Sequence, residues 1–195
     1  MNHINHKGTG YLETDRLILR RFVIEDAEAM YRNWASEDEV SKFLTWPTHS
    51  DVGETKTLLS SWIVNYEKPD FYNWAIELKE IGEVIGNISV VGAIDEKVAG
   101  ADLGYCMGTK WWGQGIMPEA GKAVIRYLFE EVGCNRIAAV HAKDNPKSGR
   151  VMQKIGMTYE GTLRQAAICN HGVIDAVWYS ILRDEYRVCN QNLEA

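Results

Sequence analysis

A loop with two glycines, between a predicted strand and a predicted helix, has clear chemical potential. It carries Gly113 and Gly115, and the helix that follows begins near Ile116. Glycine lets the backbone approach a ligand closely and turn its N–H groups outward, and a helix N-terminus adds the positive end of its dipole. Such a loop can hold a pyrophosphate. Because Gly-x-Gly pairs also occur in simple turns, the loop needs support from a second motif.

Two common phosphate-binding motifs do not fit this loop. A dinucleotide fingerprint would require a third glycine where Pro118 stands. The Gly-Lys-Ser/Thr sequence of a P-loop occurs nowhere in the chain. A pyrophosphate at this loop must therefore belong to another kind of ligand.

The second motif starts at Asn145 and runs through Ser148, Lys154 and Gly156 to Met157. Together with the segment from Trp112 to Ala120, it resembles the GNAT superfamily of acyl-CoA-dependent N-acetyltransferases. Within that superfamily the chain is similar to the RimJ/RimL type, which acetylates N-termini of ribosomal proteins. The opening segment 12–20 and the Trp46-Pro47 pair are similar too, so the resemblance covers about residues 12–183.

The resemblance implies an α+β (mixed α/β) fold: a mostly antiparallel seven-stranded sheet flanked by helices. Acetyl-CoA would be the co-substrate, bound where strands 100–107 and 136–142 splay apart, and no metal would be required. Backbone groups of 105–107 would pair with the pantetheine and the thioester, and loop 112–117 would hold the pyrophosphate. The expected cofactor-binding residues are Tyr105, Cys106, Met107, Trp112, Gly113, Gln114, Gly115, Ile116, Met117, Asn145, Ser148 and Arg150.

One departure from the superfamily concerns the departing thiolate. Many members place a tyrosine seven residues after the motif asparagine, but this chain has Met152, which cannot donate a proton. The acid is then Ser148, a water molecule or no group at all. For Ser148 the alternative is a hydroxyl that satisfies backbone donors at the helix start.

The reaction also needs a neutral amine, which a carboxylate can provide as general base. Asp102 stands on the strand that leads to the expected thioester site, and it is either this base or a structural or substrate-positioning carboxylate. The amine is expected to attack the thioester directly. An acyl-enzyme on Cys106 is the less favoured route, because a small buried cysteine is commonly part of the core.

The acceptor is predicted to contact Trp46 and His171, which lie in two separate loops. The resemblance implies the N-terminal α-amine of a protein, such as a ribosomal protein, as acceptor. A small amine (a polyamine, an amino sugar or an antibiotic) is the alternative within enzymes. A non-catalytic CoA-binding sensor is the alternative outside them.

Composition sets the remaining limits. The 195 residues carry 21 basic and 27 acidic side chains, a net charge of −6 that argues against nucleic acid as partner. The four cysteines are scattered without a metal or redox motif, and the chain has neither a signal-like apolar stretch near its start nor an apolar run long enough to span a membrane. We expect a cytoplasmic protein without membrane contact. A homodimer is possible, and the sequence does not decide the oligomeric state.

Hydrophobic periodicity predicts the elements that position these residues. One acetyltransferase domain is expected over 10–187, with flexible tails at 1–9 and 188–195. Strands are predicted at 12–22, 73–78, 83–91, 100–107, 136–142, 158–163 and 174–182. Helices are predicted at 25–35, near 40–43, after a cap at Ser50 or Asp51, at 116–132 and at 147–155.

Overall fold

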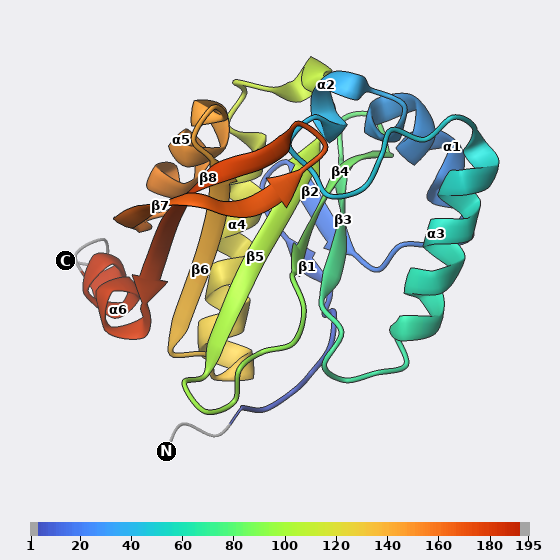
Figure 1. Cartoon of the computed structure of the whole chain (residues 1–195). Helices are drawn as coiled ribbons and strands as arrows, with labels where there is room; N and C mark the ends of the chain where they lie inside the picture. The colour runs from blue at the N-terminus through green and yellow to red at the C-terminus, as the bar shows by residue number, and fades with distance from the viewer. Residues whose placement is uncertain (1–3, 192–195) are drawn as a thin grey trace.

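The computed structural model describes residues 4–191, which form a twisted eight-stranded sheet with helices on both faces (Figure 1). The strand order is β1-β2-β3-β4-β5-β6-β8-β7. The strands are β1 (Leu12–Glu13), β2 (Leu17–Arg20), β3 (Asn73–Leu78), β4 (Glu83–Val90), β5 (Gly100–Met107), β6 (Arg136–Ala142), β7 (Thr158–Cys169) and β8 (Gly172–Leu182). The helices are η1 (Ile24–Asp26), α1 (Ala27–Met30), η2 (Tyr31–Ala35), α2 (Asp38–Ser41), α3 (Val52–Asn65), η3 (Thr109–Trp111), α4 (Ile116–Tyr127), η4 (Leu128–Val132), α5 (Pro146–Lys154) and α6 (Arg183–Gln191).

The pair β5 and β6 determines where a ligand can enter the sheet. Within residues 4–191 they are the one parallel pair, and their register covers only Gly100–Leu103 against Arg136–Ala139. Beyond that point β5 continues beside β4, and β6 continues beside β8. The expected splay between the two central strands is therefore present.

Alternating side chains of the sheet supply two separate cores. On β3, Trp74 and Ile76 join the large core that contains α4, whereas Ala75 joins a smaller core with α1 and α3. Because successive side chains of a strand point to opposite faces, the two cores lie on opposite sides of the sheet. Figure 1 agrees, with α4 behind the sheet and α3 at its right-hand side.

The eighth strand comes from the start of the chain. The predicted single strand 12–22 is instead a hairpin, in which the Thr14 N–H donates to the Leu17 carbonyl oxygen at 3.0 Å. The Thr14 hydroxyl also accepts from the Leu17 N–H at 3.1 Å. Four consecutive polar residues, from Glu13 to Arg16, interrupt the period-two pattern at this turn, and the predicted strand wrongly ran across them.

Two of the predicted helices are not regular α-helices throughout. Segment 25–35 is divided into 3₁₀, α and π turns (η1, α1 and η2), and segment 116–132 ends in the π turn η4. The next helix matches its expected start, because Asp51 caps α3 by accepting from the N–H groups of Gly53 and Glu54.

The end of the sheet is more regular than expected. The sequence predicted two short strands, 158–163 and 174–182, with a loop between them. The structure instead has one long hairpin of β7 and β8 that turns at Asn170 and His171. Arg164 and Gln165, in the middle of β7, interrupt the alternation of apolar and polar residues, so the predicted strand ended before them. A register shift between Leu163 and Ala167 absorbs them, and Gln165 there has a φ of +51°.

Parts of the two expected tails pack against the domain or continue a helix. Ile4 is only 8% exposed and belongs to the large core, and the Asn5 N–H donates to the Val132 carbonyl oxygen. Helix α6 continues through residues 188–191, where a flexible tail was expected. Residues 1–3 and 192–195 of the expected tails lie outside the described residues. Among residues 4–191, no helix combines the length and the apolar character that crossing a membrane requires.

Candidate active site

The splay of β5 and β6 opens into a pocket of about 580 Å³. Strand β5, the loop before α4, the start of α5 and helix α2 contribute its walls. The lining residues are Glu39, Val40, Lys42, Phe43, Tyr105, Cys106, Met107, Trp111, Trp112, Gly113, Gly115, Ile116, Met117, Pro118, Asp144, Asn145, Pro146, Lys147, Ser148, Arg150, Val151 and Lys154. Eleven of the twelve residues expected to bind the cofactor are therefore brought to one cavity, although they come from three separate segments.

The charge of this pocket differs from that of the chain. Four basic side chains line it (Lys42, Lys147, Arg150 and Lys154), against two acidic ones (Glu39 and Asp144). The whole chain has a net charge of −6. A local excess of positive charge in an acidic protein favours an anionic ligand such as a phosphate ester.

The glycine loop has the geometry that an anion site needs. Gly113 and Gly115 have φ angles of +78° and +76°, in the left-handed region that favours glycine. Gly115 is the N-cap of α4, and no side chain of the described chain caps this helix end. The N–H groups of Ile116 and Met117, in the first turn, therefore lack a side-chain acceptor.

Gln114 is the expected cofactor residue that does not line the pocket. Its side-chain amide donates to the Lys110 carbonyl oxygen at 2.9 Å, and its own carbonyl oxygen accepts from Arg16 at 3.1 Å. Arg16 also forms an ion pair with Glu119 at 2.6 Å. Burial opposes ionisation of Glu119, but hydrogen bonds from Thr14 and Arg16 outweigh it and lower the pKa of this carboxyl. These contacts fix the start of α4 against the β1–β2 turn.

The start of α5 meets β5 through hydroxyl groups. Asn145 is the N-cap of α5, and its side-chain oxygen accepts from the Ser148 N–H at 3.4 Å. The Tyr105 Oη lies 2.9 Å from the Ser148 Oγ and donates to the Ser148 carbonyl oxygen at 3.0 Å. Met152 is 1% exposed and packs in the core. Tyr105 and Ser148 therefore line the pocket, whereas Met152 does not.

Cys106 lines the pocket as a thiol held in its neutral form. Its Sγ donates to the Asn87 Oδ1 at 2.9 Å, and the Asn87 amide donates to the Asn73 Oδ1 at 3.1 Å. Burial raises the pKa of Cys106 to about 12. Since the thiolate is the nucleophilic form of cysteine, this environment disfavours covalent chemistry on Cys106.

Asp102 lies apart from this pocket. It is exposed on β5, in the section still paired with β6, where its partner is Ala138. It is three positions before Tyr105, about 10 Å along a strand, and this odd spacing directs the two side chains to opposite faces. The structure thus places Asp102 and Ser148 on different sides of the sheet.

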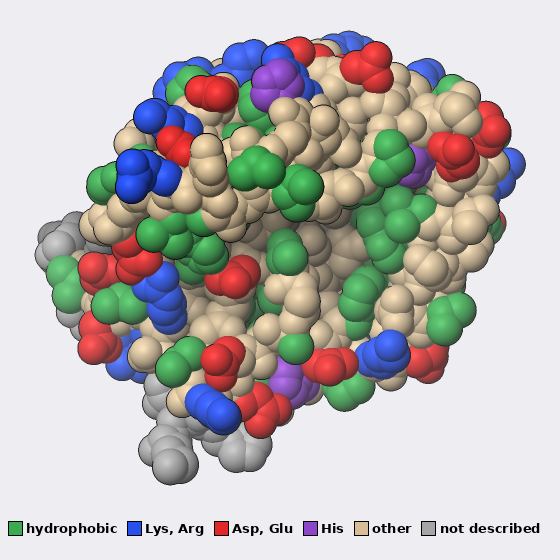
Figure 2. All heavy atoms as spheres, in the orientation of Figure 1, with side chains coloured by type: hydrophobic (Ala, Val, Ile, Leu, Met, Phe, Trp, Pro, Cys, Tyr) green, Lys and Arg blue, Asp and Glu red, His purple; other side chains and the backbone are tan. Residues whose placement is uncertain are grey.

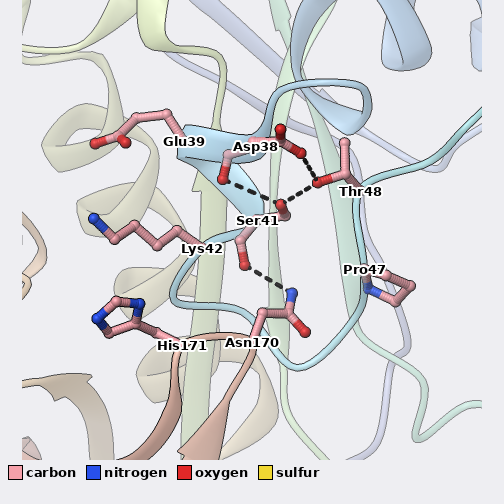
Figure 3. Close-up of a pocket in the computed structure, with 8 residues that line it drawn as sticks. All are labelled: Asp38, Glu39, Ser41, Lys42, Pro47, Thr48, Asn170 and His171. Carbon is pink, nitrogen blue, oxygen red and sulfur yellow. Dashed lines mark hydrogen bonds between the residues drawn. The ribbon is translucent and has the colours of Figure 1, made fainter.

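The two segments expected to meet the acceptor touch each other. Asn170, at the tip of the β7–β8 hairpin, donates from its side chain to the carbonyl oxygens of Ser41 and Trp46, at 2.9 and 2.6 Å. Its backbone N–H donates to the Leu44 carbonyl oxygen at 2.9 Å. Figure 3 shows the contact between Asn170 and Ser41 at the centre of a second pocket. Trp46 itself packs near His49, with ring centroids 5.4 Å apart.

This second pocket has a volume of about 400 Å³. Its lining residues are Asp38, Glu39, Ser41, Lys42, Pro47, Thr48, Asn170 and His171. Glu39 and Lys42 line both pockets, so helix α2 is the wall between them. His171 contacts Phe43 of the first pocket edge-on, with ring centroids 6.0 Å apart. The face that carries the hairpin is hollowed near its middle, below the hairpin, with hydrophobic side chains around the hollow (Figure 2).

The sequence did not indicate that α2 would form a wall of the main pocket. The helix has four residues, and no motif accompanies Glu39, Lys42 or Phe43. Its place depends on the contact with the β7–β8 hairpin, more than a hundred residues away along the chain. Lys147 and Lys154 were detectable in principle, because both stand within the second motif.

Comparison with known proteins identifies this arrangement. Residues 16–158 match the family described as "Acetyltransferase (GNAT) domain". The chain belongs to the GNAT acetyltransferase family. The uncharacterized N-acetyltransferase YoaA of Bacillus subtilis (strain 168) is 33% identical over 172 residues, which cover 88% of this chain and 96% of YoaA. The chain is an acetyl-CoA-dependent N-acetyltransferase.

Two further GNAT proteins bear on the type of enzyme. The [Ribosomal protein uS5]-alanine N-acetyltransferase of Escherichia coli (strain K12) is 26% identical over 86% of this chain and 85% of its own length. The structure of RimL, a ribosomal L7/L12 alpha-N-protein acetyltransferase in complex with coenzyme A, superposes with a TM-score of 0.79 at 22% identity, covering 90% of this chain and 99% of RimL. The RimJ/RimL resemblance is confirmed by such relatives, and at this identity the RimL superposition shows the fold alone.

Proposed function

We propose that this GNAT enzyme transfers acetyl groups to the N-terminal α-amine of a protein, such as a ribosomal protein. The observation that carries the proposal most is the similarity to the uS5-alanine N-acetyltransferase over 86% of the chain. The hollow of Figure 2 lies on the face away from α4, and an open hollow suits an extended chain end.

The donor is proposed to lie in the 580 Å³ pocket. Residues 104–107 of β5 have lost β6 as a hydrogen-bonding partner, which leaves backbone groups for the amides of the pantetheine. The N–H groups at the start of α4 would receive the pyrophosphate. Lys147, Arg150 and Lys154 are the nearest source of positive charge for the remaining phosphate oxygens, and Asn145 would contact the pantetheine arm.

The proposed chemistry is direct transfer. The neutral amine attacks the thioester carbonyl carbon, a C–N bond forms, and the C–S bond breaks with its electron pair on sulfur. Backbone N–H groups near Cys106 and Met107 would stabilise the oxyanion. The Ser148 hydroxyl would donate a hydrogen bond to the departing thiolate. Asp102 is proposed to take the amine proton through water, because it is exposed on the strand that leads to the splay.

A small cationic amine is the second candidate acceptor. The 400 Å³ pocket beside the donor pocket contains Asp38 and Glu39, and two carboxylates in a small cavity favour a compact cation. The same pocket also contains Lys42, whose positive charge opposes such a ligand.

Measuring release of the CoA thiol from acetyl-CoA with two sets of acceptors tests both candidates. One set contains short peptides with free Ala, Ser, Met or acidic N-termini; the other contains polyamines, aminoglycosides and free amino acids. Release with the peptides alone is the expected result. Release with the small amines alone would move the acceptor proposal to metabolites or antibiotics.

A further inference from the structure

The side chain of Tyr105 has no role in the proposed mechanism, although Tyr105 lines the donor pocket. Its phenol oxygen lies 2.9 Å from the Ser148 Oγ and 3.0 Å from the Ser148 carbonyl oxygen. Tyr105 stands on β5 just beyond the last residue paired with β6, and Ser148 is in the first turn of α5. This contact joins the two elements that form the sides of the splay.

The contact allows two arrangements of protons. The carbonyl oxygen can only accept, so the phenol proton points either to that oxygen or to the Ser148 Oγ. In the first arrangement the Ser148 hydroxyl donates back to Tyr105. In the second, Tyr105 donates to Ser148, whose own proton is then free to point into the pocket. Rotation of two hydroxyl groups interconverts them without moving a heavy atom.

We propose that Tyr105 is a positioning residue that directs the Ser148 hydroxyl proton toward the sulfur of the bound thioester. It would do so by donating to the Ser148 Oγ, the second arrangement, at the moment the thiolate leaves. The sulfur keeps the electron pair of the broken C–S bond and is later protonated from solvent, to which Asp102 returns the proton that it took from the amine. Tyr105 itself neither gains nor loses a proton.

The environment of Tyr105 is consistent with this role. Burial raises the pKa of its phenol far above the ordinary value, so the group remains a hydrogen-bond donor at every pH at which an amine is acetylated. The hydroxyl pair lies in the pocket from which Met152 is turned away. Tyr105 therefore supplies a phenol beside Ser148 from strand β5, in a chain that has Met152 on α5 where many members of the superfamily have a tyrosine.

The inference rests on the role proposed for Ser148, but it does not depend on the acceptor. The test compares binding of CoA with binding of desulfo-CoA, which lacks the thiol, by calorimetry between pH 6 and pH 10. In the unsubstituted enzyme the preference for CoA should rise with pH as the bound thiol ionises. Tyr105→Phe and Ser148→Ala should each reduce that rise by about tenfold. The double variant should lose no more than Ser148→Ala.

Tyr159→Phe is the matched control, because Tyr159 forms a similar pair with the Thr162 hydroxyl at 3.0 Å on exposed β7. It should behave as the unsubstituted enzyme. If Ser148→Ala lowers the preference and Tyr105→Phe does not, the role of Tyr105 is wrong while that of Ser148 stands. If neither changes it, both roles are wrong. If the reductions seen in the two single variants multiply in the double variant, Tyr105 acts independently of Ser148. A thermal melt of Tyr105→Phe checks folding, and Ser148→Ala tests the same hydroxyl pair from its other side.

Discussion

The ammonium nitrogen of Lys147 lies 4.2 Å from the centre of the Trp112 ring. The two residues belong to the two sequence motifs of the donor site, one before α4 and one in α5. A cation over an aromatic face is attracted by the ring, and the attraction is stronger where water is partly excluded. This contact therefore holds the two halves of the pocket together and keeps a positive charge beside the glycine loop.

Replacing Lys147 by Ala should weaken CoA binding by about five- to tenfold, because the pocket loses a charge and the contact with Trp112. The loss should shrink as ionic strength rises, since salt screens the interaction with phosphates. Calorimetric titration with CoA at low and high salt measures both effects. Lys143→Ala is the control, because Lys143 is paired with Asp175 outside the pocket. Equal losses in the two variants would contradict the assignment.

Gly115→Trp should reduce acetyl-CoA affinity severely, because its Cβ would lie 3.7 Å from the Arg16 guanidinium and a bulky side chain there would disturb the loop that is proposed to hold the pyrophosphate. The positive φ of Gly115 adds a conformational cost of about 1 kcal/mol for any other residue. Gly172→Ala separates the two effects, since Gly172 has a φ of +103° in the β7–β8 turn, away from the donor pocket. It should lower the melting temperature and leave acetyl-CoA binding unchanged. Unchanged binding in Gly115→Trp would refute the loop assignment.

Asp102→Asn should lower kcat at neutral pH by about 100-fold if Asp102 is the general base, and acetyl-CoA affinity should stay the same. Activity should recover as pH rises and more of the amine is neutral without help. A pH profile of kcat measures this, with Asp184→Asn on exposed α6 as control. If the kcat of Asp102→Asn equals that of the unsubstituted enzyme at every pH, Asp102 is a structural residue and not the general base.

Asn170→Ala should separate the β7–β8 hairpin from α2, because it removes the side-chain hydrogen bonds to the Ser41 and Trp46 carbonyl oxygens. The free energy of unfolding should fall by about 1–2 kcal/mol. The KM for the acceptor should rise while acetyl-CoA affinity changes little. Asn65→Ala, which removes only a local contact with Lys68, is the comparison variant. A weakened acetyl-CoA affinity with an unchanged acceptor KM would contradict this division.

Cys106 should resist alkylation by iodoacetamide up to about pH 10 in the folded protein. Its pKa of about 12 lies above the ordinary value, so the neutral thiol persists through that range. The folded state also holds this proton longer than the unfolded chain, so its contribution to stability is present below about pH 9 and is lost as pH rises toward 12. Mass spectrometry of folded and urea-unfolded samples measures the labelling. Rapid modification of folded Cys106 at pH 8 would show that its thiol is not protected.

The local sequence predicted the parts of the site that lie within one segment. The splayed strand β5, the glycines before α4 and the Asn145 cap of α5 all stand where the two motifs placed them. It could not predict contacts between segments that are far apart in the chain, such as Tyr105 with Ser148 or Asn170 with Ser41. The β1–β2 turn was missed for another reason: the predicted strand was extended across the four consecutive polar residues from Glu13 to Arg16. The proposed role of Asp102 is still a prediction, and its distance from Ser148 along the sheet limits how the two could cooperate.

The end of β5, which is paired with β4 but not with β6, has a consequence for how this protein can evolve. A pantetheine chain lying beside residues 104–107 would act as an extra strand, recognised through amide and carbonyl groups that every amino acid shares. Side chains there are free to diversify as long as the backbone path persists, with the exception of those that meet α5. Two enzymes of this kind can therefore retain the same donor while their sequences along this strand become unrecognisably different.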